Sequence, residues 1–283
     1  MSPPEIRVMT HGDIEFVMSL QEIVGWGNTR ADAERSLYYE PSGCFVASVD
    51  GIDIGMVNSF LYGDVGFIGN LIVLPDTRGS GVGAALMKKA IDRLTADGAG
   101  TIRLDGVQKA IPLYERLGFK GEYWSLRYSG VAAKAPHHSI EPMVKDDLQK
   151  VATLDRRFFG LDRTQKLRRV QHDFPDLCFK ASKGGEVRGF IMAKHGVSNV
   201  RVGPWICDPK FSDIAEPLFN ALTSKVERQK IWIGIPEFNK HSIKIVEGKG
   251  YTKTPASLRM CYGECKKVEN VPGIYSIGAP DKG

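Results

Sequence analysis

The chain has 283 residues, 42% hydrophobic and 25% charged, the balance of a globular protein with room for one or two domains. Its formal net charge of +5 suits an anionic small molecule and does not indicate nucleic acid. Without a long apolar run or the apolar core of a signal peptide, we expect no membrane contact and a cytoplasmic location.

The pattern of the first half predicts both helices and strands. Two amphipathic helices are expected at 12–24 and 30–39, and three strands at 44–49, 53–61 and 67–74. The strands are joined by short Gly/Asp links, which are typical of antiparallel hairpins. A helix at 84–95, a strand at 101–104, a helix at 111–117 and a strand at 119–128 follow.

A glycine-rich turn joins the third strand to the next helix. Unpaired N–H groups at a helix start, together with the helix dipole, form an anion site. Gly79, Gly81 and Gly83 let the backbone approach a phosphate, and Arg78 adds positive charge. We therefore expect a cofactor that carries a pyrophosphate.

Two cofactors compete for this turn. Residues 79–84 also fit the dinucleotide fingerprint G-x-G-x-x-A, and Asp105 follows at about the spacing expected of its ribose-binding carboxylate. That fingerprint normally occupies the first βα turn of a parallel sheet, whereas this turn follows antiparallel hairpins. The context disfavours a dinucleotide fold.

The flanking residues resemble a known family. The pattern Val73-x-Pro75-x-x-Arg78-Gly79-x-Gly81-x-Gly83 resembles the acetyl-CoA motif of the GCN5-related N-acetyltransferases (GNAT). Residues 110–119, which include Tyr114 and Gly118-Phe119, resemble a second signature of that superfamily. Residues 25–26, 40–45, 50–51 and 55 resemble the start of the same domain.

The resemblance implies acetyl-CoA as co-substrate, no metal, and direct attack by an amine in a ternary complex. It implies cofactor contacts from Leu71, Ile72, Val73, Arg78, Gly79, Ser80, Gly81, Val82, Gly83 and Ala84. Tyr114 matches the family's general acid, although it is also explained as a half-buried tyrosine. The strand 66–70 lacks the glutamate base of some members, and neither Asp105 nor Glu122 is assigned that role.

The acceptor site is expected between the first two helices, the end of the third strand and the last strand. Candidate lining residues are Trp26, Phe67, Asn70, Tyr123 and Trp124. Trp205 in the second half is either presented to this site or part of the core. The sequence does not name the acceptor, and the chain is expected to be a monomer or a homodimer.

The second half repeats the first at a shift of 134 residues. Pro41, Cys44 and Phe45 fall on Pro175, Cys178 and Phe179, which indicates two copies of one fold. Arg78, Gly79, Gly81 and Gly83 instead align with Ser212, Asp213, Ala215 and Pro217, so the second copy is expected to be degenerate.

The predicted fold is therefore α/β (α+β): two tandem GNAT domains, each a mixed, mostly antiparallel sheet flanked by helices. The predicted ranges are 1–130 for the cofactor-binding domain, 131–138 for a linker, 139–265 for the degenerate domain and 266–283 for a loosely packed tail. Five scattered cysteines, with only Cys261 and Cys265 close together, are expected to be reduced thiols without zinc.

The predicted function is an N-acetyltransferase whose first domain acetylates a primary amine, with a small molecule favoured. Two alternatives remain open. One is a protein lysine or N-terminal acetyltransferase, and the other is an acyl-CoA-binding sensor that forms no product.

Overall fold

The structure, a computed structural model, describes residues 3–283 and divides into two compact units. Unit 1 comprises the chain up to Glu122 together with Leu258–Lys266 and Pro280–Lys282. Unit 2 comprises Tyr123–Ser257, Lys267–Ala279 and Gly283. Each unit has a mostly antiparallel sheet flanked by helices, and this confirms the mixed α/β fold predicted from the sequence.

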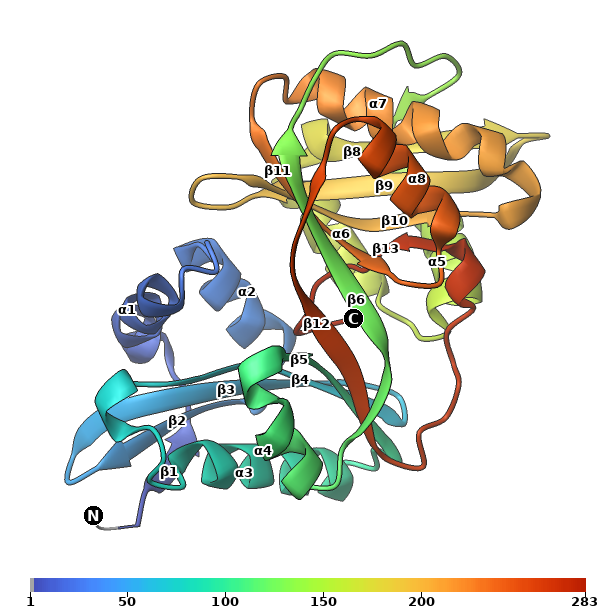
Figure 1. Cartoon of the computed structure of the whole chain (residues 1–283). Helices are drawn as coiled ribbons and strands as arrows, with labels where there is room; N and C mark the ends of the chain where they lie inside the picture. Colours follow the sequence, from blue (N-terminus) through green and yellow to red (C-terminus); the bar gives the residue numbers. More distant parts are fainter. Residues whose placement is uncertain (1–2) are drawn as a thin grey trace. The chain divides into compact units, whose positions relative to one another are not determined.

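Unit 1 has its helices on both faces of its sheet. Figure 1 shows α1 and α2 on one face and α3 with α4 on the other. Its elements in chain order are β1 Glu5–Val8, α1 Ile14–Val24, α2 Arg30–Tyr39, β2 Cys44–Val49, β3 Ile52–Tyr62, β4 Val65–Val73, α3 Val82–Ala96, β5 Thr101–Val107 and α4 Ile111–Arg116. Strands β1 to β5 are neighbours in that order.

Local sequence explains these elements. Thr29 caps α2, because its Oγ1 accepts from the Asp32 amide at 3.2 Å while Asp32 Oδ2 accepts from the Thr29 amide at 2.9 Å. The β2–β3 hairpin turns at Asp50 and Gly51, both with positive φ, as a tight two-residue turn requires. Helix α3 buries Leu86 and Leu94, since its apolar residues recur at helical spacing.

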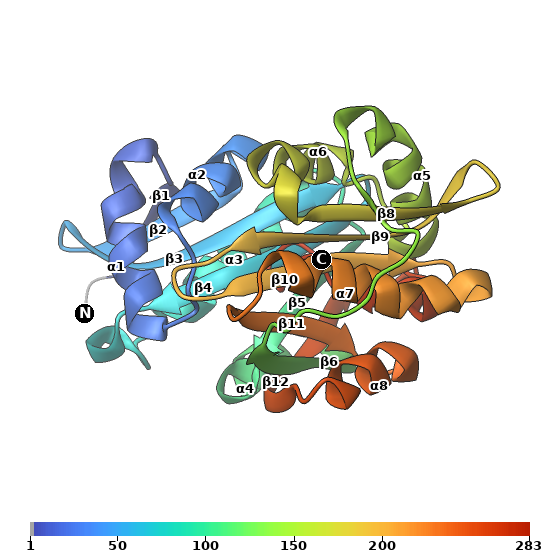
Figure 2. The ribbon, with the colours of Figure 1, turned by 90° about the horizontal axis from the view of Figure 1, so that it is seen from above.

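Unit 2 repeats this plan. Its elements are β7 Glu141–Pro142, α5 Leu148–Phe159, α6 Thr164–Asp173, β8 Cys178–Lys183, β9 Glu186–His195, β10 Val200–Cys207, α7 Ala215–Lys225, β11 Lys230–Pro236, α8 Lys240–Gly248 and β13 Ile274–Ser276. Figure 2 shows β8, β9 and β10 running side by side. Its core is built around Trp205, which is fully buried and stacks on Phe219 with ring centroids 5.3 Å apart. Trp205 is therefore a core residue.

The last strands of the two halves do not follow the predicted ranges. Strand β6, Lys120–Val131, pairs with β11 of unit 2 from Ser125↔Pro236 to Val131↔Lys230. Strand β12, Thr252–Gly263, contributes its end from Leu258 onward to unit 1, beside β5. Because the two halves share one strand pattern, sequence alone does not reveal which half each last strand completes.

Two expectations for the C-terminal region are wrong. The tail is not loosely packed, because β13 pairs with β10 and buries Ile274 and Tyr275; a strand of three residues is too short to show periodicity. Cys261 and Cys265 form a disulfide, so these two thiols are not reduced. They lie at the end of β12 and just beyond it, with Cα atoms 5.6 Å apart, within bonding range.

Candidate functional site

The turn before α3 in unit 1 has the backbone expected of an anion site. Gly79 and Gly81 adopt φ of 84° and 90°, and nothing lies within 4 Å of a Cβ built at either position. The Ala85 amide donates to the Gly81 carbonyl at 3.0 Å, so the amides of Val82, Gly83 and Ala84 precede the first helical bond. The turn is exposed and the helix dipole is positive there, so it can receive phosphate oxygens.

The side chains of the turn stabilise this shape. Arg78 Nε donates to the Val73 carbonyl at 3.0 Å, and Ser80 Oγ donates to the Thr77 carbonyl at 2.6 Å. Arg78 and Ser80 are both exposed. Arg78 thus adds positive charge at the surface of the turn.

Strand β4 is interrupted next to this turn. Asn58 faces Gly69 and Met56 faces Ile72, so Asn70 and Leu71 together oppose one residue of β3. Asn70 has φ of 51°, a left-handed conformation, and the two-against-one pairing is a β-bulge. Bulges redirect backbone groups and occur often beside active sites.

The edge of β4 that faces β5 opens at the same level. The parallel pairing runs from Val65↔Thr101 to Ile68↔Leu104, while β4 itself continues to Val73. Beyond Ile68 come the bulge residue Asn70 and the predicted cofactor residues Leu71, Ile72 and Val73. The structure therefore combines an anion-binding turn with a strand segment that leaves its parallel neighbour.

Tyr114 lies on α4, beside β5 of the same unit. A Cβ built on Gly106 would approach Tyr114 Cδ2 to 3.0 Å, so the ring packs directly on the backbone of β5. The side chain is buried, and burial raises the pKa of Tyr114 to about 12. The phenol is therefore protonated at neutral pH and can act as a donor.

Three predicted acceptor residues lie in unit 1. Phe67 is fully buried on β4, and its ring packs edge-on against Tyr62 with centroids 5.5 Å apart. Trp26 is partly buried and packs against the core cluster beneath α1 and α2. The side-chain amide of Asn70 donates to Asp281 Oδ2 at 3.1 Å.

The other two predicted acceptor residues belong to unit 2. The Tyr123 hydroxyl donates to Glu269 Oε2 at 2.9 Å, and the ring contacts Phe238. The Trp124 amide donates to Glu237 Oε1 at 2.8 Å. All of these contacts lie within unit 2, so a role for Tyr123 and Trp124 at the acceptor site stays a prediction.

The two unassigned carboxylates are held in ion pairs of unit 1. Arg259 Nε lies 2.5 Å from Asp105 Oδ1, and neither side chain is exposed. Glu122 accepts from the buried Arg103 at 2.8 and 3.1 Å. Asp105 thus neither caps a helix nor forms a turn, and Glu122 is not a solvated strand residue.

Sequence reasoning missed Asp281 and Lys282. Both belong to unit 1, where Asp281 contacts the bulge at Gly69 and Asn70. The only sequence signal was the adjacent pair of opposite charges, which indicates nothing about where the tail lies. Their position comes from the tertiary structure.

The counterpart of the anion site in unit 2 is closed. A 3-10 helix, Pro209–Ile214, replaces the glycine turn, and Asp213 forms an ion pair with Lys183 at 2.6 Å. The pairing of β10 with β11 ends at Val202↔Ile233, and β13 then pairs with β10 at Trp205 and Ile206. The edge that is open in β4 is therefore occupied in β10 by the chain itself.

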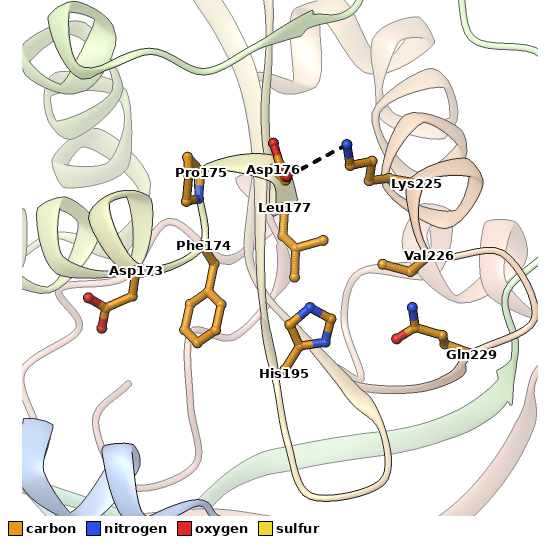
Figure 3. Close-up of a pocket in the computed structure, with 9 residues that line it drawn as sticks. All are labelled: Asp173, Phe174, Pro175, Asp176, Leu177, His195, Lys225, Val226 and Gln229. Atoms are coloured by element: carbon orange, nitrogen blue, oxygen red, sulfur yellow. Dashed lines mark ion pairs between the residues drawn. The ribbon is translucent and has the colours of Figure 1, made fainter.

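Unit 2 also carries a shallow hollow between α6, β9 and α7 (Figure 3). His195 and Phe174 face it, and Lys225 forms an ion pair with Asp176 at its rim, 3.7 Å apart. Its volume is about 240 Å³, below the ~300–1,000 Å³ of small-molecule pockets. It contains none of the motif residues, and we assign it no function.

Among residues 3–283, no group of three or more His, Cys, Asp or Glu side chains is placed to hold a metal ion. Across the same described residues, no helix combines the length and apolarity needed to span a bilayer.

Comparisons with known proteins match both halves of the chain. The acetyltransferase (GNAT) family model matches residues 15–119, and a second GNAT domain model matches residues 151–276. An acetyltransferase of Sodalis glossinidius is 33% identical over 123 residues, which cover 41% of this chain and 87% of that protein.

Solved structures agree with this fold over the whole chain. A putative acetyltransferase from Pyrococcus horikoshii superposes with a TM-score of 0.84 at 23% identity, covering 100% of this chain and 97% of the other. A tandem GNAT protein from the clavulanic acid biosynthesis pathway has a TM-score of 0.65 at 14% identity, covering 94% and 100%. This chain belongs to the GNAT acetyltransferase family, as a tandem-domain acyltransferase.

Proposed function

We propose that this protein is an N-acetyltransferase that transfers an acetyl group from acetyl-CoA to a primary amine, a small molecule being favoured. Transfer takes place in a ternary complex, with unit 1 as the catalytic unit. The observation that carries the proposal is the exposed turn with left-handed Gly79 and Gly81 at the start of α3. No equivalent turn precedes α7 in unit 2, where a 3-10 helix takes its place.

The residues of unit 1 fit the co-substrate. Residues 79–81 are exposed, and the amides of Val82, Gly83 and Ala84 precede the first helical bond, so the turn suits a pyrophosphate. The segment Leu71–Val73 lies beyond the pairing with β5 and suits an extended chain that carries amides. When bound, acetyl-CoA supplies an acetyl group activated as a thioester.

The chain's own groups have two tasks in this proposal. Main-chain N–H groups of the segment Leu71–Val73 that point away from β3 stabilise negative charge on a carbonyl oxygen, because they are held in place before the reaction. The Tyr114 hydroxyl keeps its proton at Oη at neutral pH and delivers it to the leaving sulfur. Deprotonation of the amine is left to solvent or to a carboxylate outside β4.

The test is a calorimetric titration of acetyl-CoA into the whole chain, followed by a panel of amines analysed by mass spectrometry. The proposal expects one binding site per chain and an acetylated product from at least one small amine. Two sites would contradict a degenerate unit 2. Binding without any acetylated product would favour a sensor, and product only with peptides would favour a protein acceptor.

A further inference from the structure

The segment Pro280–Lys282 packs against the bulge of β4 in unit 1. The Tyr62 hydroxyl donates to the Lys282 carbonyl at 2.6 Å, and the Asn70 side chain donates to Asp281 Oδ2 at 3.1 Å. A Cβ built on Gly69 would lie only 2.2 Å from Asp281 Cβ. Glycine at position 69 is therefore required for this close approach of the segment to the bulge.

The alkylammonium group of Lys282 lies between a carboxylate and an aromatic ring. Lys282 Nζ forms an ion pair with the Asp281 carboxylate and lies 4.8 Å from the centroid of the buried Phe60 ring. Both charged side chains are only 13% exposed. A carboxylate combined with an aromatic face is a typical arrangement for binding an organic cation.

The same face of the sheet offers a further acceptor group. Asn58 lies directly opposite Gly69 on the neighbouring strand, so its side chain projects from the face that Asp281 contacts. Its side chain is 2% exposed, and its Oδ1 is buried without a hydrogen-bond partner. An ammonium has three donors, and such a buried oxygen is suited to one of them.

The position supplies what β4 lacks. Residues 66–70 contain no carboxylate, and Asp281 brings one against Gly69 and Asn70, next to the predicted cofactor residue Leu71. A cation held there lies beside the bulge residues Gly69 and Asn70. Asp281 is thus placed to bind an acceptor, and Lys282 shows which chemistry fits.

We propose that Asp281 binds the ammonium of the acceptor and that the acceptor is a primary amine on an unbranched alkyl chain. In the ligand-free protein the Lys282 ammonium occupies the position of the acceptor ammonium. The substrate class rests on the proposed function, but the binding site does not. An acceptor must displace Lys282, a tethered competitor, before it can pair with Asp281. Small diamines and lysine side chains share this chemistry.

The first experiment measures binding without acetyl-CoA. n-Butylamine, which has the four-carbon ammonium of lysine, is titrated into the full chain while the ¹H–¹⁵N signal of the Asn70 side-chain amide is followed. We expect saturable shifts, with Kd about tenfold lower in Lys282→Met, where the tethered competitor is absent. In Asp281→Asn binding should be lost, and Asp281→Glu should restore part of it.

Two controls make the result specific. Asp92→Asn, which removes a carboxylate from the exposed surface of α3, should bind n-butylamine as the wild type does. tert-Butylamine, in which the ammonium carbon is branched, should leave the Asn70 signal unchanged. Unaltered n-butylamine binding in Asp281→Asn, or equal binding of both amines, would overturn the proposal.

The second experiment measures acetylation of cadaverine and of a peptide with one lysine. Asp281→Asn should raise KM for the amine with little change in kcat or in KM for acetyl-CoA, while Lys282→Met should lower KM for the amine. The relative kcat/KM of the two substrates distinguishes a small molecule from a lysine side chain.

If the wild type acetylates neither substrate nor any other amine, the proposed function fails, while the butylamine titration still decides the binding site. Acetylation with an unchanged amine KM in Asp281→Asn contradicts Asp281 alone.

Discussion

Arg259 and Asp105 form an ion pair in unit 1 in which neither side chain is exposed to solvent. The two residues are 154 positions apart, and their Nε–Oδ1 distance is 2.5 Å. Arg259 comes from β12, the last long strand of the chain, and Asp105 from β5. The pair therefore attaches the C-terminal strand to the sheet that carries the candidate site.

Replacing Arg259 with Met should destabilise the protein strongly. The substitution leaves Asp105 as a buried carboxylate without its partner, and such losses amount to about 3–5 kcal/mol of unfolding free energy. Urea unfolding of wild type and Arg259→Met measures the difference. Lys266→Met, which breaks the exposed Asp64–Lys266 pair, is the control and should have a much smaller effect. Equal losses in the two variants would mean that the buried pair has no special role.

Gly81→Asp should abolish the binding of acetyl-CoA. The substitution places a negative charge at the anion site and forces a non-glycine residue to adopt φ of 90°. Gly98→Asp is a matched control, because Gly98 lies beyond the other end of α3 with φ of 95° and equally open surroundings. Calorimetry should show near-normal affinity in Gly98→Asp. Tight binding in Gly81→Asp would remove the turn from the cofactor site.

The sequence predicts those parts of the site that local rules determine. Glycines at 79 and 81, a helix predicted from residue 84 that begins at Val82 in the structure, and Tyr114 on a short helix can all be inferred from spacing and resemblance. Asp281 cannot, because its contact with Gly69 joins residues more than 200 positions apart. The sequence also does not predict that most of β6 belongs to unit 2 and the end of β12 to unit 1, since each strand satisfies the pattern of either half. The ion pair of Asp105 could not be predicted either, because its partner Arg259 lies in the other half of the sequence.

Tyr114→Phe should lower turnover without changing the affinity for acetyl-CoA. The ring remains packed on Gly106, but the hydroxyl that donates the proton is lost, and general-acid catalysis contributes about 10²–10⁴-fold. Steady-state kinetics and calorimetry on the same sample separate the two effects. Tyr128→Phe, which removes a buried tyrosine hydroxyl from unit 2, should keep wild-type turnover. Normal kcat in Tyr114→Phe would exclude it as the acid.

The pH dependence of turnover offers an independent check on Tyr114. Because burial raises its pKa to about 12, the phenol stays protonated at neutral and moderately alkaline pH. Ionisation of Tyr114 should therefore cause no fall in kcat near pH 10, the ordinary pKa of tyrosine. The wild type and Tyr114→Phe should not differ in this respect. A kcat profile that falls at pH 10 in the wild type and not in the variant would contradict this prediction.

Stability should fall above pH 9 because of three buried thiols. Burial raises the pKa of Cys44, Cys178 and Cys207 from 9.0 to about 12 each. Above pH 9 the unfolded chain loses these protons while the folded chain keeps them, so the unfolded state is favoured as pH rises toward 12. Each thiol contributes at most about 1.4 kcal/mol per pH unit. Urea midpoints at pH 8 and pH 10 measure the slope, which should become shallower when Cys178 is replaced by Ala. An identical slope in that variant would show that the buried thiol is not responsible.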